Sequence, residues 1–398
     1  MKRLKLAVFN TQPPHLYFGG VERRIIEVSK RLLKEVDTRV YCGTKKGFKA
    51  ALHLKGAFLV PCESTDLFFP LDNWAFNKTI SGMYNTFKAD VYESHNVSGY
   101  GFQKVNKKRG VSKPFIQTIH GVLADEYMKS SKNGFSTLRT KLSNFILWQL
   151  SLIEKEAARN ATLVVTVSEY SAKKIVQLYG ISEAKVRIAS NGVDPQRFKP
   201  IEDNKPLKRN LGFDNKQCVL FVGRLIPRKG LHFLMEAARH VIKENKEVLF
   251  VIVGDGPLKN HLTSFSKKER LSDNFVFLGD VSDDILPIVY NCADIFTLPS
   301  IQEGQGIALL EAQATAKPVV TFNVGGISEF VLNKQAGLLV KPDSKELANA
   351  ISTLLSNQSL REKMGHFGRG FVCNNFSWAI CAQKMFHVYN EALTKEYD

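Results

Sequence analysis

Short, mainly apolar runs, most of them followed by a helical pattern, constrain the fold of this chain more than any other feature. The runs are Lys5–Phe9, Val91–Tyr92, Phe115–Ile119, Thr162–Val167, Cys218–Val222, Val248–Val253, Phe275–Leu278, Ile295–Leu298, Pro318–Phe322 and Leu338–Val340. Strands without polar alternation are typical of parallel sheets that helices cover on both faces. The pattern therefore predicts doubly wound α/β structure in both halves of the chain.

The alternation breaks once, near Asn191, and this break indicates two domains. A polar and charged stretch with two prolines follows and runs to about residue 210, a composition that is typical of a linker. A chain of 398 residues is also longer than one ordinary core supports. We predict Rossmann-like domains over 1–190 and 191–375, with a last helix over 376–398 that packs back on the first domain.

The sequence argues against an anchored or secreted protein. No apolar run reaches the roughly 18 residues that a membrane-spanning helix needs. The basic start precedes too few apolar residues for a signal peptide and reads as a first strand. The six cysteines are scattered without a Cys-x-x-Cys pair, which favours reduced thiols. We expect a cytoplasmic protein, either free or peripheral on the inner face of the membrane.

Positive charge is concentrated in the first half. Residues 1–190 contain 30 Lys and Arg against 15 Asp and Glu, whereas the rest of the chain carries a net charge of +2. A basic half beside a nearly neutral half indicates different partners for each. Nucleic acid, an anionic membrane surface, an anionic polymer and a merely soluble surface all fit this charge.

Two cations lie on the turn that follows the first strand of the second domain. The turn reads Gly-Arg-Leu-Ile-Pro-Arg-Lys-Gly, and it carries Arg224 and Lys229 at the carboxyl end of the strand. Open α/β sheets bind ligands at this edge. A guanidinium and an ammonium there suit a diphosphate, whose negative charge grows as it leaves. The alternative is a solvated pair of loop charges.

A glycine-rich turn before an apolar helix is the second chemical feature of this domain. The turn, Glu-Gly-Gln-Gly at 303–306, follows the strand Ile295–Leu298 and leads into a helix over Ile307–Ala316. Its glycines allow a ligand to approach the backbone, and the helix start offers free N–H groups. Glu311 lies too far along the helix for a cap, and its apolar neighbours indicate enclosure. Such a carboxylate suits bidentate hydrogen bonding to ribose hydroxyls.

Together these motifs resemble those of the retaining glycosyltransferases of family 4. The matching motifs, which span nearly the whole chain, are Gly-Gly-Val-Glu at 19–22, Thr-Ile-His-Gly at 118–121, Asn-Gly-Val-Asp at 191–194, Val-Gly-Arg-Leu…Lys-Gly at 222–230, Gly-Asp-Gly-Pro at 254–257, Glu-Gly-Gln-Gly…Glu-Ala at 303–312, Gly-Gly-x-x-Glu at 325–329 and Phe-Ser-Trp at 376–378. The resemblance implies the GT-B fold, in which two Rossmann-like doubly wound domains face each other across a cleft. Gln305 and Lys317 depart from the residues common in the family.

For the donor nucleotide, the resemblance implies a role at each matching position. Arg224 and Lys229 would hold the diphosphate, and Glu311 would bind the ribose. Val281, in the segment after the third strand of the second domain, would lie against the base. Gly20 would allow the glycine loop of the first domain to close over the phosphates.

For the donor sugar, the resemblance implies a second set of contacts. Glu303 would bind the sugar hydroxyls together with backbone N–H groups of the turn, at Gly304, Gln305 and Gly306. His120 would face the reacting side of the sugar from the first domain. The residues implied in catalysis are thus His120 and Glu303, with the two cations on the diphosphate.

The resemblance further implies transfer of a hexose from a UDP- or GDP-linked donor with retention at the anomeric carbon. We expect no cofactor and no metal, because the sequence lacks an Asp-x-Asp pair and the cations can stabilise the leaving diphosphate. No second carboxylate opposes Glu303 as in a hydrolase. The leaving diphosphate is therefore expected to take the proton of the acceptor hydroxyl.

The basic first domain is the predicted acceptor side. One early helix and a cluster near an aromatic-rich stretch carry its most concentrated charge, at Arg23, Arg24, Lys30, Arg31, Lys34, Lys104, Lys107, Lys108 and Arg109. This combination favours peripheral docking on anionic lipid and hence a lipid-linked or cell-surface glycan acceptor. A soluble acceptor and a nucleotide-sugar epimerase are the alternatives. A nucleic-acid binder would explain the charge but not the two glutamates, so we expect no nucleic-acid partner.

Overall fold

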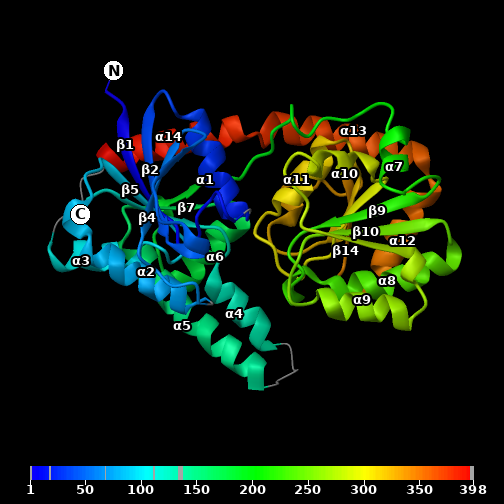
Figure 1. The fold of residues 1–398 in the computed structure, drawn as a ribbon, viewed down its shortest axis with the longest axis horizontal. Helices are drawn as coiled ribbons and strands as arrows, with labels where there is room; N and C mark the ends of the chain where they lie inside the picture. Colours follow the sequence, from blue (N-terminus) through cyan, green and yellow to red (C-terminus); the bar gives the residue numbers. More distant parts are fainter. Residues whose placement is uncertain (1, 18, 68, 111–112, 133–137, 395–398) are drawn as a thin grey trace. The chain divides into compact units, whose positions relative to one another are not determined.

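The chain divides into two compact units, each built on its own sheet (Figure 1). The N-terminal unit comprises residues 1–191 and 378–398, and the C-terminal unit comprises residues 192–377. The computed structural model describes residues 2–17, 19–67, 69–110, 113–132 and 138–394. The last four residues of the predicted C-terminal helix lie outside this part of the chain.

Eight strands form the sheet of the N-terminal unit in the order β3-β4-β2-β1-β5-β6-β7-β8. All neighbouring pairs are parallel except β3 with β4. The strands are β1 (Leu4–Phe9), β2 (Val36–Gly43), β3 (Leu52–Leu54), β4 (Ala57–Cys62), β5 (Val91–His95), β6 (Phe115–Ile119), β7 (Leu163–Thr166) and β8 (Val186–Ile188). The strand order reverses between β1 and β5, so the switch point, where such sheets bind ligands, lies at the carboxyl ends of these strands.

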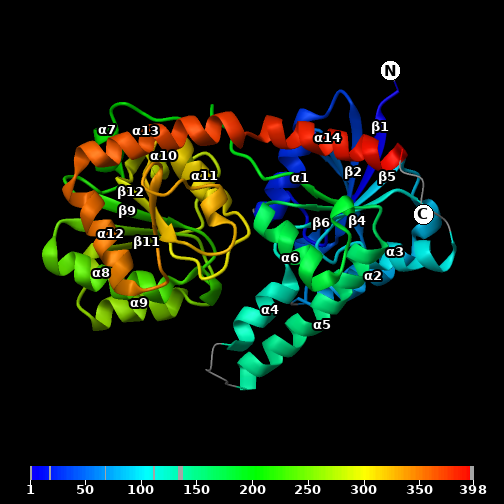
Figure 2. The ribbon, with the colours of Figure 1, turned by 180° about the vertical axis from the view of Figure 1, so that it is seen from behind.

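Seven helices are described in this unit: α1 (Gly20–Arg31), α2 (Leu71–Gly82), α3 (Tyr100–Lys108), α4 (Leu123–Lys132), α5 (Leu138–Asn160), α6 (Glu169–Tyr179) and α14 (Trp378–Thr394). Helix α14 comes from the far end of the sequence and packs on α1 and β5. Helices α4 and α5 lie side by side as a hairpin that extends away from the sheet (Figures 1 and 2). Helix α14 thus belongs to the N-terminal unit although it lies at the far end of the sequence.

Six parallel strands form the sheet of the C-terminal unit in the order β11-β10-β9-β12-β13-β14. The strands are β9 (Gln217–Val222), β10 (Val248–Val253), β11 (Phe275–Gly279), β12 (Ile295–Leu298), β13 (Val319–Phe322) and β14 (Gly337–Val340). The helices are α7 (Lys205–Asn210), α8 (Leu231–Glu244), α9 (Lys259–Lys268), α10 (Leu286–Cys292), α11 (Ile307–Ala314), α12 (Ser344–Ser356) and α13 (Gln358–Asn375). The order reverses between β9 and β12, the arrangement of the dinucleotide-binding Rossmann sheet.

The prediction of parallel α/β structure in both halves is confirmed, and its errors have local causes. Helix α11 ends at Ala314, because Ala316 takes a left-handed φ of 56° that a continuing helix excludes. The predicted linker contains the short helix α7, which packs on α10.

Candidate active site

Two loops leave neighbouring strands at the switch point of the C-terminal unit. The turn with the two predicted cations follows β9, and the Glu-Gly-Gln-Gly turn follows β12. The backbone N–H of Ile301 donates to the carbonyl oxygen of Arg228 at 3.0 Å. A Cβ added at Gly230 would lie 1.9 Å from the carbonyl oxygen of Pro299, so this close approach requires glycine. The two predicted motifs therefore lie against each other.

An ion pair joins these loops. The Lys229 ammonium lies 2.5 Å from Oε2 of Glu303, and the side chains are only 13% and 11% exposed. The Ser300 hydroxyl donates to the same oxygen at 3.2 Å, and the Arg228 guanidinium lies 3.9 Å from the other oxygen. Burial opposes ionisation of this carboxyl, but the charges of Lys229 and Arg228 outweigh it and hold the pKa of Glu303 below its ordinary value. The site thus holds a carboxylate and an ammonium side by side.

Glycines shape the backbone around Glu303. Gly306 takes a φ of +83° and is the N-cap residue of α11, so the helix begins directly after the turn, at Ile307. A Cβ added at Gly325 would lie 2.0 Å from the carbonyl oxygen of Glu303, and the N–H of Gly326 donates to that oxygen at 3.1 Å. The predicted Gly-Gly-x-x-Glu turn therefore packs against the backbone of Glu303 and holds its carbonyl oxygen by a hydrogen bond.

Glu311 is buried, with 3% of its surface exposed. The Tyr290 hydroxyl donates to its Oε2 at 2.9 Å, and the same hydroxyl contacts the carbonyl oxygen of Ala308 at 3.3 Å. A buried carboxylate needs such a donor, because an unpaired one costs several kcal/mol. Its enclosure agrees with its apolar neighbours, and its contact with a ribose stays a prediction.

The other predicted donor-binding residues take no part in this ion pair. Arg224 is exposed, and among the described residues its side chain makes no hydrogen bond or ion pair. Gly304 is half-buried, whereas Gln305 is 2% exposed, so this departure from the family places an amide side chain in the interior. Val281 lies between β11 and α10 and packs on the core. The structure therefore joins Lys229 to Glu303 and leaves Arg224 as a solvated cation on the same turn.

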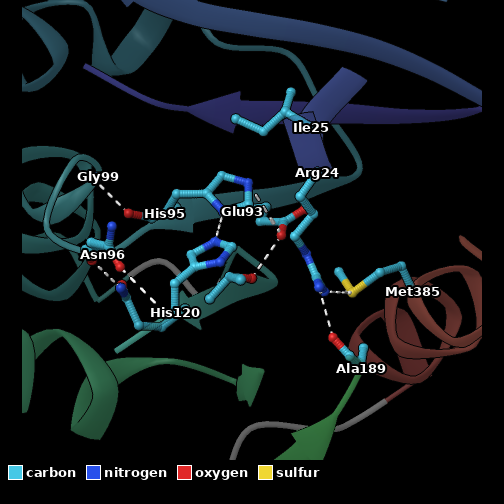
Figure 3. Close-up of polar contacts among 12 residues, drawn as sticks. Arg24, Ile25, Glu93, His95, Asn96, Gly99, His120, Ala189 and Met385 are labelled. Carbon is cyan, nitrogen blue, oxygen red and sulfur yellow. Dashed lines mark hydrogen bonds and ion pairs between the residues drawn. The ribbon is translucent and has the colours of Figure 1, made fainter. Parts of the chain in front are cut away.

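The two predicted residues of the N-terminal unit lie at the carboxyl edge of its sheet. Gly20 is exposed and is the first residue of α1. It does not have the positive φ that would require glycine. His120 follows β6, and its Nε2 lies 3.0 Å from Nδ1 of His95, the last residue of β5 (Figure 3). Among the described residues, Gly20 and His120 make no hydrogen bond to each other.

Sequence reasoning missed a buried polar cluster behind His120. Glu93 and His95 are each 2% exposed on β5, where apolar residues are expected. Arg24, which the sequence predicts on the basic surface, is instead 1% exposed and donates to the carbonyl oxygen of Ala189 at 2.6 Å. Polar residues at alternate positions of a buried strand are the signal that could have found this cluster.

The comparisons with known proteins decide the family. Residues 203–371 match the family described as "Glycosyl transferases group 1", and residues 18–197 match "Glycosyltransferase Family 4". The chain is 32% identical over 262 residues to the capsular polysaccharide biosynthesis glycosyltransferase CapM of Staphylococcus aureus, a match that covers 63% of this chain and 67% of CapM. The chain belongs to the family 4 glycosyltransferases.

Further relatives of this glycosyltransferase agree in sequence and in fold. An uncharacterized glycosyltransferase of Methanocaldococcus jannaschii is 28% identical over 321 residues, which cover 78% of each chain. The sucrose-phosphate synthase of Thermosynechococcus elongatus superposes with a TM-score of 0.82 at 19% identity, covering 98% of this chain and 99% of that one. HepE of Anabaena superposes with a TM-score of 0.80 at 21% identity, covering 98% and 100%. The predicted GT-B fold class is confirmed.

No described helix combines the length and apolar character needed to cross a membrane. Within the same residues, no three His, Cys, Asp or Glu side chains gather as they would around a metal ion.

Proposed function

We propose that this glycosyltransferase transfers a hexose from a UDP- or GDP-linked donor to an acceptor hydroxyl, with retention at the anomeric carbon. The Lys229–Glu303 ion pair at the switch point of the C-terminal sheet carries the proposal. A diphosphate needs a cation that stabilises its growing charge, and a sugar needs acceptors for its hydroxyl hydrogens. The pair supplies one of each at the edge where such sheets bind ligands.

The leaving diphosphate is assigned to Lys229, Arg224 and the start of α11. Lys229 already carries its charge in a partly desolvated place, which strengthens its attraction to an incoming anion. Arg224 is solvated and able to swing onto a phosphate without breaking another contact among the described residues. The helix start adds backbone N–H donors. These groups replace a metal ion in the proposal, and no other cofactor is invoked.

The sugar is assigned to Glu303 and the backbone of the following turn, with His120 contributing from the N-terminal unit. Glu303 is held ionised by its neighbours, so both of its oxygens accept hydrogen bonds. Glu311 is assigned to the ribose and Val281 to the base. The HepE structures, which are described as complexes with UDP, with UDP-glucose, and with UDP and glucose, support a donor of this chemical class.

Calorimetric binding of UDP and GDP tests the donor assignment. We expect one of them to bind, and Lys229→Met to weaken binding by about 10-fold or more. The matched control is Lys246→Met, an exposed lysine before β10. Absence of binding to both nucleotides, or equal loss in the control, would contradict the proposal. A screen of nucleotide sugars then identifies the sugar, and turnover of the donor without any acceptor would indicate an epimerase instead.

An exposed apolar face on α5 supports a membrane-associated acceptor. Four large side chains, at 39–60% exposure, recur at helical spacing: Leu142, Phe145, Trp148 and Leu152. The rings of Phe145 and Trp148 lie 5.8 Å apart, so the face is contiguous. An exposed apolar stripe on a helix is typical of interfacial docking, and the basic first half favours anionic lipid. We propose that this face docks on the inner side of the membrane and that the acceptor is lipid-linked or a cell-surface glycan.

Sedimentation with vesicles tests the docking. We expect binding to vesicles that contain anionic lipid, weakened by salt and abolished by the double substitution Phe145→Glu and Trp148→Glu. The control is Phe367→Glu on α13, a comparably exposed phenylalanine in the C-terminal unit. Binding that ignores lipid charge, or that survives the double substitution, would leave the soluble-acceptor alternative.

A further inference from the structure

The buried cluster behind His120 is a chain of hydrogen-bonding groups that begins on the C-terminal helix. The Tyr389 hydroxyl of α14 donates to Oε2 of Glu93 at 2.7 Å. The Thr118 hydroxyl donates to Oε1 at 2.7 Å. Nε2 of His95 lies 3.6 Å from that Oε1, and its Nδ1 lies 3.0 Å from Nε2 of His120 (Figure 3). Hydrogen bonds therefore join Tyr389 to Glu93 and His95 to His120, and a close contact of 3.6 Å, longer than a hydrogen bond, lies between Glu93 and His95.

Glu93 is arranged as a carboxylate acceptor. Each of its oxygens receives a hydroxyl hydrogen, and neither oxygen has to donate in this geometry. Burial raises the pKa of Glu93 above its ordinary value, and the Thr118 hydroxyl, the charge of Arg24 and the Tyr389 hydroxyl oppose this rise. The case for a carboxylate therefore rests on the two hydroxyl groups that donate to its oxygens. Arg24 itself is fixed by the Ala189 carbonyl and by the sulfur of Met385, so its charge stays beside the carboxylate.

The charge of Glu93 decides which nitrogen of His95 carries the hydrogen. Burial keeps both imidazoles neutral, since it lowers the pKa of His95 to about 3 and that of His120 well below its ordinary value. A neutral imidazole has one N–H and one lone pair. A lone pair on Nε2 of His95 would face a negative oxygen, so the hydrogen is favoured there. Nδ1 of His95 is then an acceptor.

The tautomer of His95 in turn determines the tautomer of His120. Because Nδ1 of His95 accepts, the hydrogen bond of 3.0 Å requires that Nε2 of His120 donates. The ring hydrogen of His120 is then used in the hydrogen bond to His95, and the Nδ1 of His120 carries the lone pair. Among the described residues, no hydrogen-bond partner lies at this Nδ1. The ring therefore offers an acceptor to a ligand.

We propose that Glu93 and His95 act as positioning residues that hold His120 in the Nε2–H tautomer, with Nδ1 as a hydrogen-bond acceptor for a hydroxyl of the donor sugar. Tyr389 extends the arrangement to α14 by supporting Glu93. The inference about the tautomer stands on the buried contacts alone, and only the role toward the sugar rests on the proposed function. It assigns His120 to recognition of an O–H donor, in a state in which it cannot itself donate to the sugar.

Nitrogen NMR of the full chain, labelled with ¹⁵N in the histidine rings and deuterated elsewhere, reads the tautomer directly. His120→Asn identifies the His120 signals. We expect the unprotonated-nitrogen signal at Nδ1 of His120 at neutral pH. In Glu93→Gln the amide has no charge and can turn either group toward His95, so we expect signals of mixed tautomers at His120. Tyr389→Phe, a milder change, should shift them part of the way.

The control is Glu154→Gln, which replaces another wholly buried carboxyl of the same unit by an amide. Glu154 also receives a tyrosine hydroxyl, from Tyr179, but it makes no hydrogen bond to either histidine. We expect this variant to keep the wild-type signals of His120. A hydrogen on Nδ1 of His120 in the wild type, or an unchanged tautomer in Glu93→Gln, would overturn the proposal.

Kinetics separate this proposal from the proposed function. We expect Glu93→Gln to lower kcat about 10-fold, as is common when an orienting partner is lost, with little change in the affinity for the free nucleotide. A donor that lacks the recognised hydroxyl should be equally slow with both enzymes. If the tautomer changes as expected but kcat does not, the assignment of His120 to the sugar is wrong and the buried arrangement stands.

Discussion

The ion pair between Lys229 and Glu303 predicts that its two halves affect nucleotide binding in opposite directions. In this structure the carboxylate competes with any phosphate for the same ammonium. Lys229→Met removes the cation, whereas Glu303→Gln removes its competitor and leaves the ammonium available. Free UDP or GDP is the right probe, because it contains the diphosphate but not the sugar that Glu303 is proposed to bind.

The magnitudes follow from the burial and the contacts. A hydrogen bond to a charged group contributes about 1.5–3 kcal/mol, so Lys229→Met is expected to weaken nucleotide binding about 10- to 150-fold. The exposed fractions of 13% and 11% place the pair between surface and core, and the competing contact is worth about 1 kcal/mol at most. Glu303→Gln is therefore expected to strengthen binding about 2- to 5-fold while it lowers kcat about 100-fold.

Isothermal titration calorimetry with the bound nucleotide measures both signs, and steady-state release of nucleotide measures kcat. Lys246→Met controls for the loss of one positive charge, and Ser300→Ala controls for a lost neutral contact to Glu303. Thermal unfolding of each variant verifies folding. If Lys229→Met and Glu303→Gln weaken nucleotide binding equally, the pair is a structural strut and the competition argument is refuted.

Three further outcomes are expected. Gly325→Ala should lower the free energy of unfolding by about 2 kcal/mol in urea titrations and weaken nucleotide binding, because φ is +59° and the new Cβ would meet the backbone of Glu303. Gly370→Ala lies inside helix α13, where a Cβ meets nothing, so it should raise the free energy of unfolding by up to about 1 kcal/mol and leave nucleotide binding unchanged. Burial raises the pKa of Glu154 to about 8, so the folded chain keeps a proton that the unfolded chain loses, and its contribution to stability falls as pH rises from about 5 to 8. Unfolding at several pH values should show that Glu154→Gln flattens this fall, and an unchanged slope would contradict the assignment. Chelation with EDTA should leave glycosyl transfer unchanged, and restoration of lost activity by a divalent ion would refute the metal-independent proposal.

Strands were predictable where burial on both faces leaves a continuous apolar run. β10 and β12 have the predicted bounds, because no charged residue interrupts them. β5 was predicted only over Val91–Tyr92, since Glu93 and His95 end the apolar run although the strand continues through them. The end of α11 was missed for a different reason: alanine at 316 gives no sign of a left-handed backbone.

The candidate site was predictable as a set of residue types but not as a set of contacts. The motifs identified Lys229 and Glu303 separately, 74 positions apart. Their pairing depends on β9 lying next to β12, although β10 and β11 come between them in the sequence. The contact between Tyr389 and Glu93 spans 296 positions. A local sequence pattern predicts which residues form a helix or strand and which are buried. Contacts between distant residues depend instead on strand order and on where a terminal helix packs.

In each unit the predicted chemistry collects where the strand order reverses, and this has a physical cause. In the C-terminal unit the reversal separates β9 from β12, the two strands whose following loops form the ion pair. In the N-terminal unit it lies at β1 and β5, and β5 ends at His95 beside His120. On either side of a reversal the crossover connections run in opposite directions, so the loops diverge and backbone and side chains become available to a ligand. A carboxylate buried there needs partners from within the protein. Glu303 has the Lys229 ammonium, and Glu93 has two hydroxyl groups and the His95 ring. These partners fix the charge of Glu303 and, in our proposal, the tautomer of His120.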